Sequence, residues 1–177
     1  MTIHIFSFTC YLLLSIGLAF LIVKFVGERS KVTGSSMEPH LKHNDQIIIE
    51  KLSYRFRNPK RFEIIVIPLN KHTKKAYYIK RVIAMPEETI QIKKGHIYIN
   101  DQKLDDIYGL EEIKHSGLAS KKIHLKAEEY FVLGDHRNDS LDSRDVRMGI
   151  IGKKEIIGRA WMKIKKGITF LSPPSSK

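Results

Sequence analysis

Ser36 is the first residue of this chain whose type and setting could do chemistry. It lies in the Gly/Pro-rich stretch Gly34–Pro39 (GSSMEP). A serine in such a stretch is usually only a turn residue. On a tight turn it can also be a nucleophile, with backbone N–H groups near Gly34 and Ser36 placed to stabilise a developing oxyanion. The residue types alone leave both interpretations open.

Lys80 is the second such residue, and it lies in an apolar, strand-like run. Alternation along a strand puts Lys80 on one face with Tyr78 and Val82, and Arg81 on the opposite face. A lysine in a strand is normally a solvated edge residue. If its face is buried, desolvation lowers the lysine pKa from about 10.4 toward neutrality. A neutral lysine can serve as general base for a serine hydroxyl without a histidine.

A third stretch, Gly134–Arg144 (GDHRNDSLDSR), is dense in charge. Such a span usually forms a salt-bridged surface loop. It fits a calcium loop poorly, because Arg137 stands where an oxygen ligand should be. Asn138-Asp139-Ser140 matches the glycosylation sequon, a pattern short enough to occur often by chance. A hydrogen-bonded loop that positions a catalytic side chain is the remaining interpretation.

Histidine and cysteine offer weaker alternatives. The chain has eight scattered histidines, so a Ser-His-Asp triad built on His136 or His40 is a minor alternative. Cys10 is the only cysteine, which excludes an intrachain disulfide and a cysteine-based metal site.

Short apolar runs bounded by turn signals predict a mainly β fold, a curved or barrel-like antiparallel sheet behind one N-terminal transmembrane helix. A Lys-Lys-Gly turn between two of the runs predicts a hairpin. The predicted strands cover residues 46–50, 63–67, 76–85, 89–92, 96–99, 130–133 and 156–164.

Residues 5–23 carry no charge and nearly span a hydrocarbon core of about 30 Å. A cleaved signal would need a basic start and a small-residue cleavage site, and a buried helix would show a polar stripe. We therefore predict a membrane anchor over residues 1–28, a β-rich peptidase domain over 29–171 and a disordered tail over 172–177. Basic residues after the apolar segment would place the domain in the cytoplasm by the positive-inside rule, against the function inferred below.

The net charge of +12 predicts a polyanionic neighbour. Lysine and arginine are scattered along the chain, without a zinc-ligand cluster or an RNA-binding aromatic signature. We therefore expect anionic lipid or wall polymer, and no nucleic acid.

In their order and spacing, the three stretches resemble the sequence boxes of type I signal peptidases, specifically the small Gram-positive form. The likeness runs from about Val32 to Trp161 and includes the anchor. It implies that Ser36 attacks and that Lys80 is the general base. It also implies that Ser140 helps to orient the lysine, and that Asp142 and Arg144 shape the site.

The resemblance further implies a membrane-bound serine endopeptidase that removes signal peptides through an acyl-enzyme, without a metal or organic cofactor. Pockets for small substrate side chains would be lined by Val32, Tyr78 and Ile79. The expected partners are secretory preproteins, membrane lipids and the export machinery. The protein would be a single-pass protein of the cell membrane, with its catalytic domain on the extracytoplasmic side.

The sequence departs from the family pattern mainly at turns, and at none of the predicted catalytic positions. Two other functions stay open: a self-cleaving repressor-type protease, and a non-catalytic anchored β module that binds wall or lipid. The departures are His40 for Thr, Asn44 for Gly, Ala84 for Gly, Phe62-Glu63 for Gly-Asp and Glu87-Glu88 for Gly-Asp.

Overall fold

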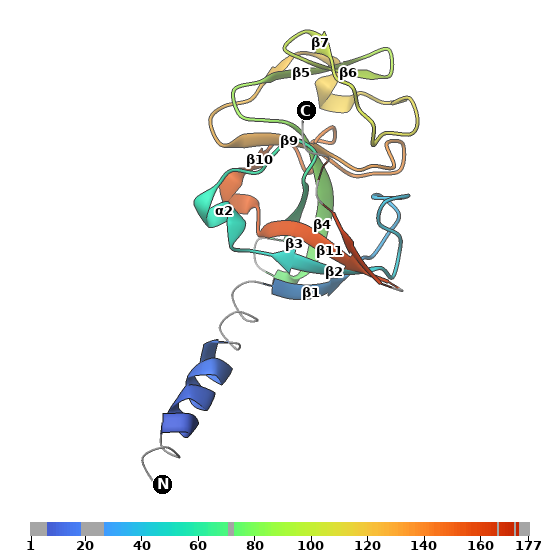
Figure 1. The fold of residues 1–177 in the computed structure, drawn as a ribbon. Coiled ribbons are helices and arrows are strands. Elements are labelled where there is room, and N and C mark those ends of the chain that lie inside the picture. Colours follow the sequence, from blue (N-terminus) through green and yellow to red (C-terminus); the bar gives the residue numbers. More distant parts are fainter. Residues whose placement is uncertain (1–6, 19–26, 71–72, 166, 172, 174–177) are drawn as a thin grey trace.

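The computed structural model describes residues 7–18, 27–70, 73–165, 167–171 and 173. Two antiparallel sheets dominate it, together with short helical turns (Figure 1). The elements after the N-terminal helix are β1 (Gly27–Lys31), β2 (Gln46–Glu50), α2 (Ser53–Phe56), β3 (Ile64–Asn70), β4 (Thr73–Ala84), β5 (Thr89–Lys93), β6 (His96–Ile99), β7 (Gln102–Lys103), η1 (Gly117–Ser120), β8 (Ile123–His124), β9 (Glu129–Leu133), β10 (Ile151–Gly152), η2 (Lys153–Glu155), β11 (Gly158–Ile164) and β12 (Ile168–Phe170).

The larger sheet has the strand order β1-β2-β11-β3-β4-β9-β10, with β12 added to β11. Its strand β3 is buried on both faces: Ile64 and Val66 enter one apolar cluster, while Ile65 and Ile67 enter another. Alternation along the strand produces this division. A strand covered on both faces explains why the sequence shows a continuous apolar run here.

The smaller sheet, which we call the cap sheet, has the order β7-β6-β5-β8 and lies at the top of Figure 1. A third apolar cluster joins it to the larger sheet, because Ile90 and Ile97 of the cap sheet pack with Phe131 and Leu133 of β9. The segment 104–116 between β7 and η1, the cap loop, runs back toward the larger sheet. The two sheets therefore share a core.

The mainly β prediction is confirmed, and the predicted strands and hairpin are present with shifted ends. The predicted barrel-like closure is wrong. Within the described residues the larger sheet runs as an open path from β1 to β10, and no strand pairing joins these two ends. The hairpin turn fits its residues, since Lys94 and Gly95 both have positive φ.

The N-terminal helix covers residues 7–18, is exposed along its length and stands apart from the sheets (Figure 1). The predicted transmembrane helix is not found: no helix among the described residues combines the length and hydropathy that a membrane crossing needs. Part of the predicted segment 5–23 lies outside the described residues, as does the predicted tail apart from Pro173.

Four strands begin with the same turn, which we call an acid corner. In each corner an acidic carboxylate accepts a hydrogen bond from the backbone N–H three residues earlier, at 2.8–2.9 Å. The residue just before the acid has a positive φ of 65–70°. The corners are Lys42–Asp45 before β2, Lys60–Glu63 before β3, Met85–Glu88 before β5 and Lys126–Glu129 at the start of β9.

Three departures from the resembled family pattern fall in the acid corners. Asn44, Phe62 and Glu87 are the positive-φ residues of three corners, and the family usually has glycine at each of these positions. Glycine adopts this backbone conformation freely, whereas most other residues pay about 1–2 kcal/mol. The left-handed backbone is kept here without glycine, while the carboxylate that closes the turn is retained.

Candidate active site

Ser36 and Lys80 meet at the edge of the larger sheet. Lys80 lies in β4, opposite Ile65 of β3, and only 2% of its surface is exposed. Its Nζ is 2.7 Å from Ser36 Oγ, a hydrogen-bonding distance. The sheet thus supplies a buried lysine, and the turn after β1 supplies the hydroxyl that it contacts.

Burial lowers the pKa of Lys80 from 10.5 to about 8. Desolvation is the largest cause, because it disfavours the ammonium form. The charges of Asp142 and Asp135 act in the opposite direction and raise the pKa, while Arg144 lowers it. Desolvation prevails over both carboxylates, so about a tenth of Lys80 is neutral at pH 7, far more than for an ordinary lysine.

The turn that carries Ser36 is anchored by apolar side chains on its far side. Met37 and Leu41 are buried in the core cluster next to β2, and the Leu41 N–H donates to the Met37 carbonyl. Gly34 has φ +97°, a conformation that favours glycine. These features fix the direction in which the Ser36 side chain points from the turn.

The two predicted oxyanion donors differ in availability. The Gly34 N–H donates to His43 Nδ1 at 3.2 Å, so it is occupied in this structure. Among the described residues, no hydrogen-bond partner is found for the Ser36 N–H. In the part of the chain that the structure describes, the Ser36 amide is therefore a free backbone donor at the nucleophile itself.

The loop after β9 packs directly on the Ser36 turn through Gly134. A Cβ added at Gly134 would lie 2.5 Å from the Ser36 carbonyl oxygen and 2.2 Å from Ser140 Oγ, so only glycine fits. Asp142 accepts a hydrogen bond from the Gly134 N–H at 3.1 Å and forms a two-point ion pair with Arg144. The predicted supporting residues thus hold the backbone that contacts Ser36.

Ser140 lies beside Gly134, and its Oγ is buried without a hydrogen-bond partner among the described residues. A buried hydroxyl with no partner is uncommon in folded proteins. The contact with Lys80 that the family resemblance implies is not formed in this structure.

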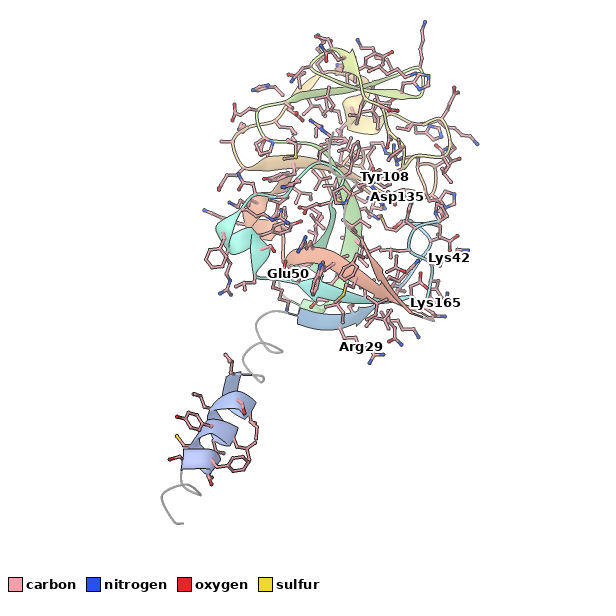
Figure 2. The ribbon with its side chains drawn as sticks, viewed as in Figure 1. Arg29, Lys42, Glu50, Tyr108, Asp135 and Lys165 are labelled. Atoms are coloured by element: carbon pink, nitrogen blue, oxygen red, sulfur yellow. The ribbon has the colours of Figure 1, made fainter. Side chains whose placement is uncertain are left out.

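Arg81 and Asp135 form a buried ion pair behind Lys80 that the sequence analysis did not identify. The two side chains make two hydrogen bonds, of 2.7 and 2.6 Å. The Arg81 guanidinium also stacks 3.6 Å from the ring centroid of Tyr108 in the cap loop, and Tyr108 and Asp135 lie together between the two sheets (Figure 2). The sequence signal was a charged residue on the buried side of β4 and an acid directly after β9.

A groove of about 410 Å³ opens at the dyad. Tyr78 and Ile79, two of the three predicted pocket residues, line it together with Ser36 and Lys80. Val32 is not among its lining residues, because its side chain is buried in the core cluster with Met37. The groove runs along β4 and the end of β1, a position that suits an extended peptide.

The histidine alternatives do not reach the nucleophile. His40 Nδ1 lies 3.0 Å from Asp135 Oδ2, and His136 lies between Glu111 and Asp139 at 3.8 Å from each. Of the described side chains, only that of Lys80 forms a hydrogen bond with Ser36 Oγ. The described residues also contain no group of three or more His, Cys, Asp or Glu side chains arranged to bind a metal ion.

The family model and the sequence relatives that match this chain belong to one family. The family described as "Signal peptidase, peptidase S26" matches residues 5–164. A probable signal peptidase I-2 of Synechocystis is 36% identical over 150 residues, which is 82% of this chain and 66% of that protein. Signal peptidase I of Leptolyngbya laminosa is 36% identical over 92% of this chain and 82% of that protein.

Two further matches are less similar in sequence. Signal peptidase I P of Bacillus subtilis subsp. natto is 33% identical over 83% of this chain and 82% of that protein. A crystal structure of a signal peptidase I from Enterococcus faecalis is 27% identical with a TM-score of 0.47, over 58% of this chain and 97% of that one. The family match and the sequence relatives suffice: the chain belongs to the type I signal peptidase (peptidase S26) family.

Proposed function

We propose that this protein is a membrane-bound endopeptidase that removes signal peptides from exported preproteins, using Ser36 as nucleophile and Lys80 as general base. The observation that carries the proposal is the 2.7 Å contact between Lys80 Nζ and Ser36 Oγ at a lysine whose pKa is lowered to about 8. A base with a pKa near the working pH combines a useful neutral fraction with useful proton affinity.

In the first half of the reaction, neutral Lys80 accepts the Ser36 hydroxyl proton while Oγ attacks the carbonyl carbon at the end of the signal peptide. The Ser36 N–H donates to the resulting oxyanion. The Lys80 ammonium then returns its proton to the leaving amine, the C–N bond breaks, and an ester to Ser36 remains.

In the second half, neutral Lys80 takes a proton from water, which attacks the ester carbonyl. Collapse of the tetrahedral intermediate returns the proton from Lys80 to Ser36 and releases the signal peptide as a carboxylic acid, which then gives its proton to solvent. Ser140 orients Lys80 during both steps: its Oγ is buried beside Gly134, has no hydrogen-bond partner among the described residues and is available to the lysine when substrate is bound. Asp142 and Arg144 hold this loop in place.

The preprotein lies extended in the groove beside β4, adding to the sheet edge as peptides often do. Tyr78 and Ile79 line this groove and limit the size of the substrate side chains that precede the cut. Small side chains at the first and third positions before the cut are the expected preference.

The apolar segment 5–23 anchors the chain in the cell membrane, with the catalytic domain on the extracytoplasmic side near the export machinery. The N-terminal helix 7–18 has its side chains exposed, as an anchor outside its bilayer would. Arg29, Lys42 and Lys165 lie toward the same end of the larger sheet in Figure 2, and Lys165 also pairs with Asp45. This basic group attracts anionic lipid head groups.

The test uses the full chain in detergent and a purified secretory precursor. We expect mature-length product from the wild type, and none from Ser36→Ala or Lys80→Ala. Ser35→Ala is the matched control, since the Ser35 hydroxyl donates to Asp139 at 2.6 Å and not to Lys80. Cleavage that survives Ser36→Ala would exclude the proposed nucleophile. A folded wild type that cleaves no precursor would favour the non-catalytic β module.

A further inference from the structure

We propose that Arg137 is a positioning residue for the Ser36–Lys80 dyad, and that it ties the loop after β9 (residues 134–144, the catalytic loop) to the cap loop through Asp106. The inference rests on the proposed function. Arg137 is 98% buried, with 2% of its surface exposed, an unusual degree of burial for a charged side chain. Its Nε and Nη1 have partners in the backbone and in the cap loop, whereas its buried Nη2 has no hydrogen-bond partner among the described residues.

The inner contact of Arg137 reaches the backbone that packs on the nucleophile. Its Nε donates to the Gly134 carbonyl at 3.0 Å, while Asp142 accepts from the Gly134 N–H. Gly134 is therefore held at both of its polar backbone groups. Because its Cα packs against the Ser36 carbonyl and Ser140 Oγ, a shift of Gly134 would move both hydroxyl-bearing residues relative to Lys80.

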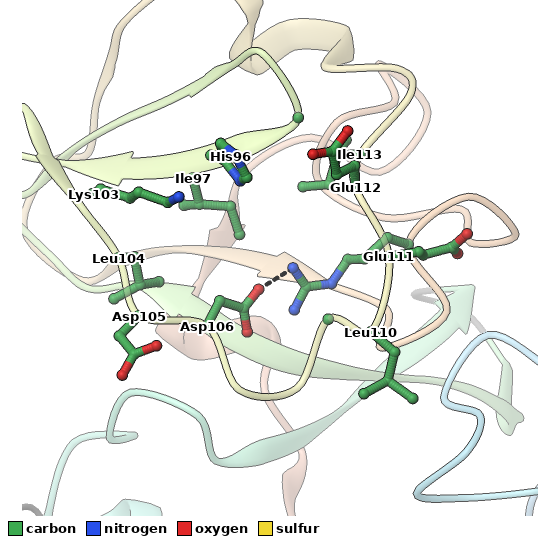
Figure 3. Close-up of a pocket in the computed structure, with 13 residues that line it drawn as sticks. His96, Ile97, Lys103, Leu104, Asp105, Asp106, Leu110, Glu111, Glu112 and Ile113 are labelled. Atoms are coloured by element: carbon green, nitrogen blue, oxygen red, sulfur yellow. Dashed lines mark hydrogen bonds and ion pairs between the residues drawn. The ribbon is translucent and has the colours of Figure 1, made fainter.

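The outer contact of Arg137 fixes it to the cap loop. Its Nη1 donates to Asp106 Oδ2, the interaction drawn as a dashed line in Figure 3. Asp106 is itself held, since its other oxygen accepts the Tyr108 N–H at 3.2 Å, and Tyr108 stacks on Arg81 beside the dyad. The cap loop thus contacts the catalytic loop through the buried Arg137 and, closer to the surface, through hydrogen bonds of Asn138 and Arg144. Tyr108 adds an indirect connection through Arg81 and Asp135.

Arg137 also lies between two cavities, of about 480 Å³ and about 210 Å³, and lines both. The first is bordered by exposed acids of the cap loop such as Glu112 (Figure 3), and the second contains Ser140. Truncation of Arg137 would join its vacated volume to these cavities. A guanidinium ion from solution could then occupy the position of the missing side chain.

The experiment measures kcat and KM for precursor cleavage by the full chain. We expect Arg137→Ala to lower kcat about 100-fold with KM changed less than about threefold, because a misplacement of about 1 Å in an active site costs a factor of this size. Asp106→Asn should give a smaller loss, and the two losses should not add in the double variant, since both break one connection. Asp105→Asn is the matched control in the same loop and should cleave at the wild-type rate.

Chemical rescue separates positioning from general stability. Guanidinium chloride at tens of millimolar should raise the rate of Arg137→Ala about tenfold, relative to sodium chloride at equal ionic strength, and should leave the wild type unchanged. If Arg137→Ala does not fold, Arg137→Lys is used. This variant should fold, and its kcat should fall by a smaller factor than is expected for Arg137→Ala.

Three results would overturn the proposal. The Arg137 variants could cleave at the wild-type rate, their losses in kcat could add to that of Asp106→Asn, or they could raise KM and leave kcat unchanged. A wild type that fails to cleave would instead overturn the peptidase function on which it rests.

Discussion

Replacing Lys80 by Met should make the protein more stable at pH 7 while abolishing cleavage. The folded state holds Lys80 at a pKa of about 8, against 10.5 for the ordinary side chain. Each unit of difference corresponds to about 1.4 kcal/mol. Below pH 8 the lysine is charged in both states, so burying the ammonium costs the fold about 3 kcal/mol.

Met has a similar length and no charge, so it removes this cost. It also leaves the Ser36 hydroxyl without its 2.7 Å partner, a loss of about 1 kcal/mol. We therefore expect Lys80→Met to raise the free energy of unfolding by about 2 kcal/mol at pH 7. Between pH 8 and 10.5 the unfolded wild type binds more protons than the folded one, so wild-type stability rises with pH there and the advantage of Lys80→Met disappears.

Urea unfolding of both proteins in detergent, followed by the fluorescence of the only tryptophan, Trp161, measures this difference at several pH values. The difference between the two free energies of unfolding cancels the contribution of every group that titrates alike in both proteins. Two results would refute the assignment of Lys80 as a buried base with a lowered pKa. The variant could be less stable than the wild type at pH 7, or its gain in the free energy of unfolding could stay constant up to pH 10.5.

Three further outcomes are expected. The value of kcat/KM should rise about tenfold per pH unit up to about pH 8 and then level off, because neutral Lys80 is the active form; a profile flat from pH 6 to 9 would contradict this. Gly134→Ala should lower cleavage at least about 100-fold, since its Cβ would lie 2.2 Å from Ser140 Oγ, and wild-type activity would disprove the close packing. Glu87→Gly should raise the free energy of unfolding by about 0.5–1 kcal/mol by relieving a φ of 65°, as measured by thermal unfolding. Glu87→Ala, which removes the same side chain without relieving the backbone, should give no such gain.

Sequence patterns predicted those strands whose stability comes from apolar side chains. The runs that became β2, β3, β4 and β9 bury isoleucine, valine or phenylalanine on at least one face. β1 was missed because its sequence, GERSK, is polar, and the strand forms by backbone pairing with β2. The sheet closure was mispredicted because the pairing of distant edges is a property of the whole topology, which alternation does not encode.

The candidate site divides in the same way. Ser36 and Lys80 could be predicted because their local settings are unusual, and the resemblance to signal peptidases fixed which serine and which lysine to choose. Arg81, Asp135 and Arg137 could not be assigned roles, because their partners lie 31 to 54 positions away. A charged residue that will be buried by a distant partner looks the same in sequence as one that stays in solvent.

The acid corners bear on how the chain folds. Each corner is a local turn closed by residues three positions apart, so it can form without a distant strand partner. The pairing of β4 with β9, by contrast, joins Arg81 to Leu133 and must wait for a long loop to close. Preformed corners at the starts of β2, β3, β5 and β9 fix where these strands begin, and hence which side chains face each way, before the sheet assembles. An early alignment of this kind reduces the number of wrong registers available to a sheet rich in isoleucine, and such registers are the ones most prone to aggregate.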